Sequence, residues 1–103
     1  MAIRVETEFI RRETVRCICY VYDDDEALVN ATSVDISIKD PDGTAVVDEA
    51  AMSNAAGTGI YEYYYTTTTA VIEGNYQIEC DITDSSYHTY VHGHFRMMAG
   101  INE

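Results

Sequence analysis

Hydrophobic and polar residues alternate with a period of two along most of this chain. In residues 33–39 the apolar set is Val34, Ile36 and Ile38, and the polar set is Asp35, Ser37 and Lys39. Because successive side chains of a β-strand point to opposite faces, this pattern predicts a strand with its apolar face in a core and its polar face in water.

Three more segments show the same alternation and are predicted to be strands on the same grounds. Their inward residues are Val15, Cys17, Cys19 and Val21 in residues 13–23, Tyr76, Ile78, Cys80 and Ile82 in residues 74–82, and Val91, Phe95 and Met97 in residues 87–97. The outward residues of the middle segment, Gln77, Glu79 and Asp81, are polar.

A turn is predicted at DPDG, residues 40–43, because proline fixes φ at its second position and glycine closes it. Residues 44–49 then return as a short strand. Residues 48–56, DEAAMSNAA, are the one segment that could form a helical turn.

The stretch GTGIYEYYYTTTT, residues 57–69, raises the question of whether its tyrosines form a recognition surface or fill a sheet. Alternation puts Tyr61, Tyr63 and Tyr65 on one face, and Glu62, Tyr64 and Thr66 on the other. A charged Glu62 should face water, so the tyrosines of the opposite face are expected to point inward, with their hydroxyls near an edge where partners exist. Tyr64 is the exception and is expected to point outward.

About seven strands, separated by turn signals, are typical of an antiparallel sandwich. We therefore predict an all-β fold, a single sandwich domain of about seven strands over residues 1–103. Its predicted core consists of Val15, Cys19, Val21, Val34, Ile36, Ile38, Tyr61, Tyr63, Tyr76, Ile78, Ile82, Val91 and Phe95.

The length and the net charge of the chain limit the number of domains and the classes of partner it can bind. The 103 residues suffice for one domain with a modest core. With 18 Asp and Glu against 6 Lys and Arg, the formal net charge is −12, which argues against nucleic acid or an anionic membrane as a partner. No apolar segment is long enough to span a membrane, and residues 1–13 lack the apolar region of a signal peptide. We expect synthesis in a reducing cytoplasm, where disulfides are rare.

The sequence holds no G-x-S-x-G, no phosphate-binding loop and no C-x-x-C. We therefore expect no catalytic residue and no cofactor.

A histidine cluster and an acidic cluster could each bind a metal ion or simply be exposed to water. His92 and His94 lie two apart on one predicted strand with His88 on the same face, a spacing that could bind a transition metal. No carboxylate or cysteine clearly joins them, so we expect a solvated polar face. Residues 23–26, DDDE, offer oxygen ligands suited to calcium, but they lack the D-x-D-x-D-G spacing and are expected to form a solvated loop.

Several motifs follow one another in a familiar order. They are FIRRETVRCICYVYD (residues 9–23), SVDISIKDPDGTAVVD (33–48), GTGIYEYYYT (57–66), EGNYQIECDI (73–82) and GHFRM (93–97). In this order the chain resembles the immunoglobulin-like β-sandwich domains of the macroglobulin type and their shorter relatives in bacterial and phage structural proteins. Their hairpin reads V-x-I-x-I-x-D-P-x-G-x-x-V, and the strands that follow read G-x-Y-x-x-x-Y and G-x-Y-x-I.

The resemblance implies an immunoglobulin-like sandwich and a non-enzymatic role, since such modules serve as spacers, adhesins and assembly parts. A small single domain of this kind resembles virion proteins of tailed phages and related viruses, which are made in the host cytoplasm and assembled onto a head, neck or tail. Its partners would be other proteins of the assembly or further copies of itself. The alternative is a binding or adhesion module of a larger surface protein.

Two departures from the pattern matter. The chain has Arg11-Arg12 where those domains have Pro-Gly, so we expect this corner to be built differently, and its third strand lacks the tryptophan of antibody-type domains. Immunoglobulin domains also carry an inter-sheet disulfide between the second and penultimate strands. The resemblance thus allows a bridge from Cys80 to Cys17 or Cys19, although we expect buried thiols in a reducing compartment.

The same arrangement puts residues 13–23 and 60–66 in one sheet. The outward residues of that sheet are Ile18, Tyr20, Tyr22 and Tyr64, flanked by Arg16 and Glu62. Tyrosines beside an arginine are enriched at protein interfaces, so we predict that this face binds a partner. The alternative is that residues 48–56 fold over it.

Overall fold

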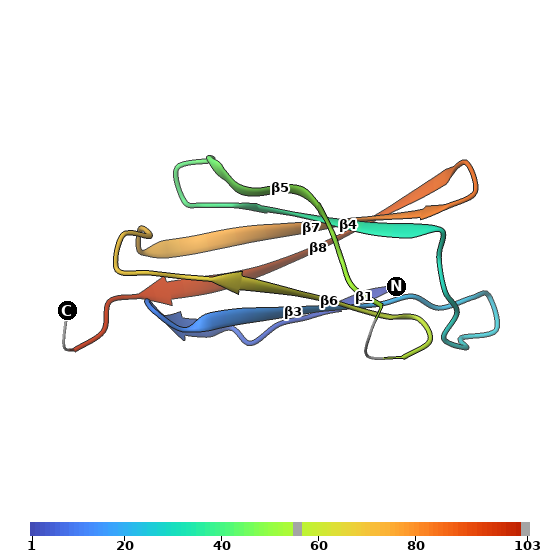
Figure 1. The fold of residues 1–103 in the computed structure, drawn as a ribbon, viewed down its shortest axis with the longest axis horizontal. Coiled ribbons are helices and arrows are strands. Elements are labelled where there is room, and N and C mark those ends of the chain that lie inside the picture. The colour runs from blue at the N-terminus through green and yellow to red at the C-terminus, as the bar shows by residue number, and fades with distance from the viewer. Residues whose placement is uncertain (55–56, 102–103) are drawn as a thin grey trace.

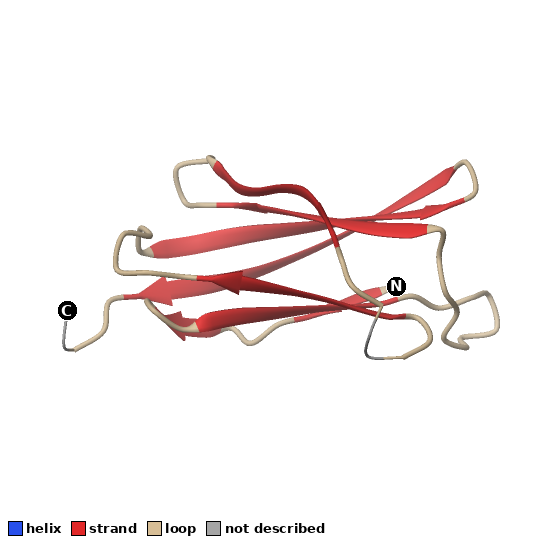
Figure 2. Ribbon diagram, viewed as in Figure 1, coloured by secondary structure: helices blue, strands red, loops and turns tan. Residues whose placement is uncertain are grey.

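The computed structural model describes residues 1–54 and 57–101 as two packed β-sheets (Figure 1). Figure 2 shows that strands and loops make up the whole of the described chain. The eight strands are β1 (Ala2–Arg4), β2 (Glu8–Ile10), β3 (Thr14–Tyr20), β4 (Ser33–Lys39), β5 (Ala45–Ala51), β6 (Ile60–Thr66), β7 (Gly74–Asp84) and β8 (Tyr87–Met98).

One sheet has the order β1-β3-β6 and the other the order β2-β8-β7-β4-β5. The predicted all-β sandwich is confirmed. Of the two segments predicted to share a sheet, residues 14–20 and 60–66 do so, whereas Tyr22 lies beyond β3 and forms an isolated bridge to Leu28. Two details differ from the prediction. The short strand β1 was not expected, and β2 pairs with β8 in parallel rather than antiparallel fashion. Neither three-residue strand is long enough to show a clear alternation.

The core lies between the sheets and follows the predicted phases. Val15, Ile36 and Phe95 are fully buried, and the ring of Phe95 stacks on Tyr76 at 5.0 Å between centroids. Tyr63 and Val91 are only partly buried, in contrast to the prediction. The structure adds Phe9, Cys17, Val47, Met52, Cys80 and Met97 to the predicted core.

Residues 48–54 do not form the helical turn that the sequence allowed for residues 48–56, and residues 55 and 56 lie outside the described chain. Strand β5 runs to Ala51, where it pairs with β4, and Met52 N still donates to Val34 O. Ser53 then forms an antiparallel bridge to Glu62 of β6 in the other sheet. The chain therefore crosses from one sheet to the other within two residues, in an extended conformation that leaves no room for a helix.

The corner at Arg11-Arg12 is built differently from Pro-Gly, as expected. Arg12 has φ +87°, a left-handed conformation that is unusual for a residue with a side chain. Its backbone N–H donates to Thr67 Oγ1, which in turn donates to the carbonyl of Glu13. A buried threonine from another part of the chain thus holds this corner.

A close backbone contact explains why position 59, just before the tyrosine-rich strand, is a glycine. A Cβ at this position would lie 2.9 Å from the carbonyl of Val21 and from the backbone N of Val29, and φ is +72°. Only glycine fits without moving the backbone. The close approach lets Val21 N donate to Gly59 O, which starts the pairing of β3 with β6.

Candidate functional site

The predicted binding face is the outer surface of the sheet β1-β3-β6. Strand β3 pairs with β6 in an unbroken register, in which Arg16 lies opposite Tyr64 and Ile18 opposite Glu62. Since directly opposed residues share a face, the outward set of β3 and β6 gathers there as predicted.

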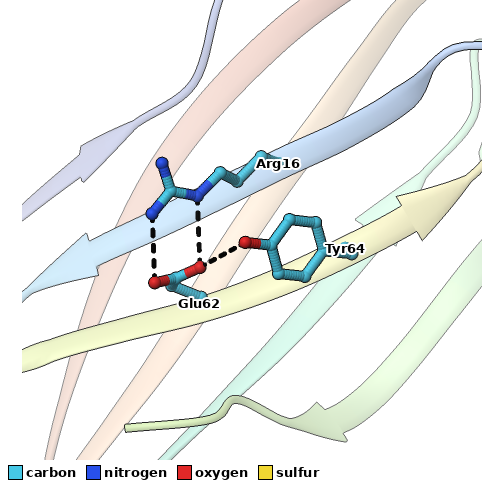
Figure 3. A network of polar contacts seen from close by, with 3 residues as sticks. All are labelled: Arg16, Glu62 and Tyr64. Carbon is cyan, nitrogen blue, oxygen red and sulfur yellow. Dashed lines mark hydrogen bonds and ion pairs between the residues drawn. The ribbon is translucent and has the colours of Figure 1, made fainter. Parts of the chain in front are cut away.

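Arg16, Glu62 and Tyr64 form one polar network (Figure 3). The guanidinium of Arg16 makes two contacts with the carboxylate, Nε to Oε2 at 3.1 Å and Nη2 to Oε1 at 3.0 Å. The hydroxyl of Tyr64 donates to the same Oε2 at 2.6 Å. Such bidentate arginine–carboxylate pairing fixes the planes of the guanidinium and of the carboxylate relative to each other. The hydrogen bond from the Tyr64 hydroxyl then holds the tyrosine ring against the fixed carboxylate.

The network shifts the titration of its members. Hydrogen bonds from Arg16 and then from Tyr64 lower the pKa of Glu62. The hydrogen bond to Glu62 raises the pKa of the Tyr64 hydroxyl and that of Arg16. Glu62 therefore stays ionised, and Tyr64 stays a neutral donor, around neutral pH.

Exposure varies across this face. Tyr64 is 56% exposed and is the most accessible of the predicted tyrosines, whereas Ile18, Tyr20 and Tyr22 are half-buried. Tyr20 and Tyr22 stack with 6.4 Å between ring centroids. The bare apolar patch is thus smaller than the sequence suggested, with Tyr64 as its centre.

A shallow groove of about 620 Å³ crosses the same face beside β1. It adds Arg4, Glu6 and Glu13 to the predicted residues Arg16, Ile18 and Tyr20. Arg4 was missed because it belongs to β1, and only the register that sets Arg4 opposite Ile18 brings it to this face.

Residues 48–54 do not cover this face, which was the alternative to a binding surface. Their closest approach to β6 is the bridge between Ser53 and Glu62 at its edge, and Tyr64 remains exposed. Residues 55 and 56, the rest of that predicted segment, lie outside the described chain.

The histidines lie on the outer face of the other sheet, as predicted, but they pair singly with carboxylates. His88 Nδ1 lies 2.8 Å from Asp81 Oδ1, and His92 Nε2 lies 2.7 Å from Glu79 Oε2. His94 lies opposite Gln77 on β7. Within residues 1–54 and 57–101, no three histidine, cysteine or carboxylate side chains converge as metal ligands.

The acidic residues 23–26 form a tight turn. Asp23 Oδ1 accepts hydrogen bonds from the backbone N–H groups of Asp25 and Ala27, both at 2.9 Å. This is the ordinary capping role of an aspartate in a turn, and the carboxylates of the segment are exposed.

The three cysteines are buried free thiols. Burial raises the pKa of Cys17 to about 12. The neighbouring Cys19 thiol and burial together raise the pKa of Cys80 above its usual value, and Cys80 Sγ also lies 3.7 Å from Met52 Sδ. Cys17 and Cys80 are therefore protonated in the folded protein. The hydrogen bond with Cys80 instead lowers the pKa of Cys19, and burial shields all three thiols from reagents.

No described helix could cross a membrane, since the described chain is built of strands and loops.

No protein-family model matches the chain, and no curated protein matches it. Among solved structures it is similar to the filamin domain of Lin-41, with a TM-score of 0.66 and 21% sequence identity. The superposition covers 96% of this chain and 92% of the Lin-41 domain. The chain thus has the fold of an immunoglobulin-like β-sandwich.

Proposed function

We propose that this protein is a non-enzymatic protein-binding module that contacts its partner through the outer face of the sheet β1-β3-β6. The observation that carries the proposal is the exposed Tyr64, held in place by Glu62 and Arg16. Tyrosine and arginine, together with tryptophan, are the side chains enriched at the energetic centres of interfaces.

The network favours binding because its side chains are ordered before a partner arrives. Ordering a flexible side chain at an interface costs roughly 0.5–1.5 kcal/mol, and a ring that is already held avoids part of this cost. The neighbouring half-buried Ile18 and Tyr20 supply apolar area, and Arg4 lines the adjoining groove as a polar rim.

A non-enzymatic role is supported by the sequence, which lacks the nucleophile and phosphate-binding motifs named above. The partner is a protein rather than nucleic acid or an anionic membrane, because the net charge of −12 repels both of these. It is another protein of an assembly, or a further copy of this chain.

In its more specific form, the proposal is a small virion component of a tailed phage or related virus, made in the host cytoplasm and assembled onto a head, neck or tail. Its support is the order of motifs in residues 9–97, which resembles that of phage structural domains. The competing form is an adhesion module of a larger surface protein. A capsid, portal or tail gene next to this one would favour the virion, and an adjoining export signal or adhesin repeat would favour the surface protein.

The binding face is tested with the double variant Tyr20→Glu/Tyr64→Glu. The matched control is Tyr90→Glu/Gln77→Glu on the opposite sheet, where Tyr90 is 57% exposed against 56% for Tyr64. Both double variants add the same charge to an outer sheet face. Circular dichroism and thermal melting establish that both remain folded.

Assembly is then measured by analytical ultracentrifugation and by incorporation into the native particle or complex. We expect the variant at Tyr20 and Tyr64 to lose assembly and the control to keep it. Normal assembly of the first variant would place the contact elsewhere on the molecule.

A further inference from the structure

We propose that the free edge of β6 receives an extended, lysine- or arginine-bearing segment of a partner protein as an additional strand. This inference rests on the proposed function, a protein-binding role for this sheet, and it adds the conformation and the charge of the partner.

The backbone of β6 is paired on only one side over its second half. Glu62 exchanges both of its backbone hydrogen bonds with Ser53, at 2.7 and 2.9 Å, so its N–H and C=O point away from β3. Backbone groups alternate in direction along a strand, and those of Tyr64 and Thr66 therefore point the same way as those of Glu62. Within the described residues no backbone partner meets Tyr64 or Thr66 on that side.

The segment that follows β5 in the same chain leaves the edge of β6 after a single bridge, between Ser53 and Glu62. If β5 continued along β6, Ala51 would lie opposite Tyr64, but Ala51 pairs instead with Asp35 of β4. In Figure 1, β5 and β6 approach each other at the right and lie apart at the left, where β6 ends. The strand that would complete the sheet is thus missing over Tyr64 to Thr66.

This edge has few of the usual defences against strand addition. Edge strands are normally guarded by proline, lysine, bulges or inward charges. The sequence of β6, IYEYYYT, has no proline or lysine, and its register with β3 shows no bulge. By contrast, β5 at the edge of the other sheet is irregular, with register shifts and Glu49 at φ +50°.

Charge decides between a partner segment and a second copy of this chain. Residues 40–54, which lead from the turn after β4 to the bridge with β6, contain Asp40, Asp42, Asp48 and Glu49 and no basic residue. Burial raises the pKa of Tyr65 most, and the negative charge of Asp40 raises it further. Two copies joined edge to edge would bring these acidic segments together on chains of net charge −12, whereas a basic segment would be attracted.

The side chains beside the edge suggest the pattern of the added strand. Tyr63 and Tyr65 point inward but are only partly buried, so apolar side chains at alternate positions of the partner would cover their exposed rims. The intervening positions would face water and carry the lysine or arginine. The expected segment therefore alternates apolar and basic residues.

The test uses the full chain and a capped peptide of about six residues in which valine alternates with lysine, the usual length of a β-strand. A matching peptide with glutamate in place of lysine is the charge control. Tyr64→Pro removes the outward N–H without breaking a bond to β3, and Tyr64→Val removes the same ring and hydroxyl but keeps that N–H.

We expect the lysine peptide to bind, with hydrogen exchange at the amides of Tyr64 and Thr66 slowed about tenfold or more. Tyr64→Pro should weaken binding about tenfold, the effect of roughly one hydrogen bond with its geometry, and Tyr64→Val should weaken it markedly less.

Any of four results would overturn the inference. Equal losses in Tyr64→Pro and Tyr64→Val would show that the peptide is held by the side chain on the sheet face, which would leave the proposed function intact. Protection of Tyr64 and Thr66 in a concentration-dependent dimer without peptide would make a second copy the occupant. Absence of binding would remove the edge site, and equal binding of the glutamate peptide would refute the basic partner. In both cases the assembly test at Tyr20 and Tyr64 would still decide the proposed function separately.

Discussion

The hydroxyl of Thr67 accepts a hydrogen bond from the backbone N–H of Arg12 at 2.9 Å, although the two residues lie far apart in the sequence. The same hydroxyl donates to the carbonyl of Glu13 at 2.6 Å. Thr67 is 3% exposed, and both hydrogen bonds are partly buried. One buried hydroxyl therefore satisfies the corner that leads from β2 into β3.

We expect Thr67→Val to lower the free energy of unfolding by about 1–3 kcal/mol, because it removes two partly buried hydrogen bonds, each worth about 0.5–1.5 kcal/mol. Urea denaturation of the pure protein measures the change. Thr67→Ser keeps the hydroxyl and should recover most of the loss. If the valine variant were as stable as the parent protein, the hydroxyl would have no role in holding the corner.

The core should respond strongly to truncation. Ile36 and Phe95 are fully buried, and Phe95 also contacts Phe9 edge-to-face at 5.5 Å. Replacing either with alanine should cost about 2–5 kcal/mol through lost burial and a cavity. Val46→Ala, at a position 36% exposed, should cost far less in the same thermal or urea experiment. Losses below about 0.5 kcal/mol at both buried sites would contradict the strand phases.

The hairpin between β7 and β8 offers a stabilising substitution. Asp84 pairs with Tyr87, which leaves Ser85 and Ser86 as the loop, and Ser85 has φ +57°. Glycine tolerates this conformation, so Ser85→Gly should raise the free energy of unfolding by about 0.5–1 kcal/mol. Ser86 has no positive φ, and Ser86→Gly should instead lower stability. The reverse order of the two melting temperatures would refute this assignment.

The network on the binding face should be visible in a pH titration. The pKa of Glu62 in the folded state lies below its ordinary value of 4.5, so the stabilisation from its ionised form is complete above that value and is lost as the pH falls through the folded pKa. NMR titration of the Glu62 carboxyl measures the shift directly. Arg16→Ala should raise this pKa more than Tyr64→Phe does, since Arg16 is the larger cause. A Glu62 pKa unchanged by Arg16→Ala would show that the pair does not persist in solution.

The three thiols should not react with a thiol reagent until the protein unfolds. Cys17, Cys19 and Cys80 are at most 1% exposed. A thiol reagent such as Ellman's reagent should therefore label none of them in the native protein and all three in denaturant without reductant. A count of one in denaturant would reveal a disulfide, and peptide mapping would show whether it joins Cys80 to Cys17 or to Cys19.

The sequence predicts the long strands well because each has one face in the core and one in water. Val34, Ile36 and Ile38 alternate with polar residues, and the structure buries this apolar set as expected. The same logic correctly turns Tyr61 inward and Tyr64 outward. It overestimates the burial of Tyr63, because alternation gives the direction of a side chain but not the position of its strand at an edge of the sheet.

The remaining features depend on which strands become neighbours. Arg4 reaches the binding face only through the pairing of β1 with β3, and the three residues of β1 are too few to show a period. The free edge of β6 likewise follows from the departure of β5 toward β4. The segment that makes this turn, residues 48–54, is rich in small and polar residues and carries no clear periodicity.

The crossing at Met52 and Ser53 also governs how the sandwich can come apart. Met52 bonds to Val34 in one sheet, and Ser53 bonds to Glu62 in the other. On the opposite flank, the short path from β1 to β2 joins the same two sheets, with Arg96 N donating to Thr7 O. Short segments thus connect the two sheets on both sides of the sandwich, so we expect that neither sheet separates from the other alone. The domain should therefore lose its hydrogen-exchange protection as one cooperative unit.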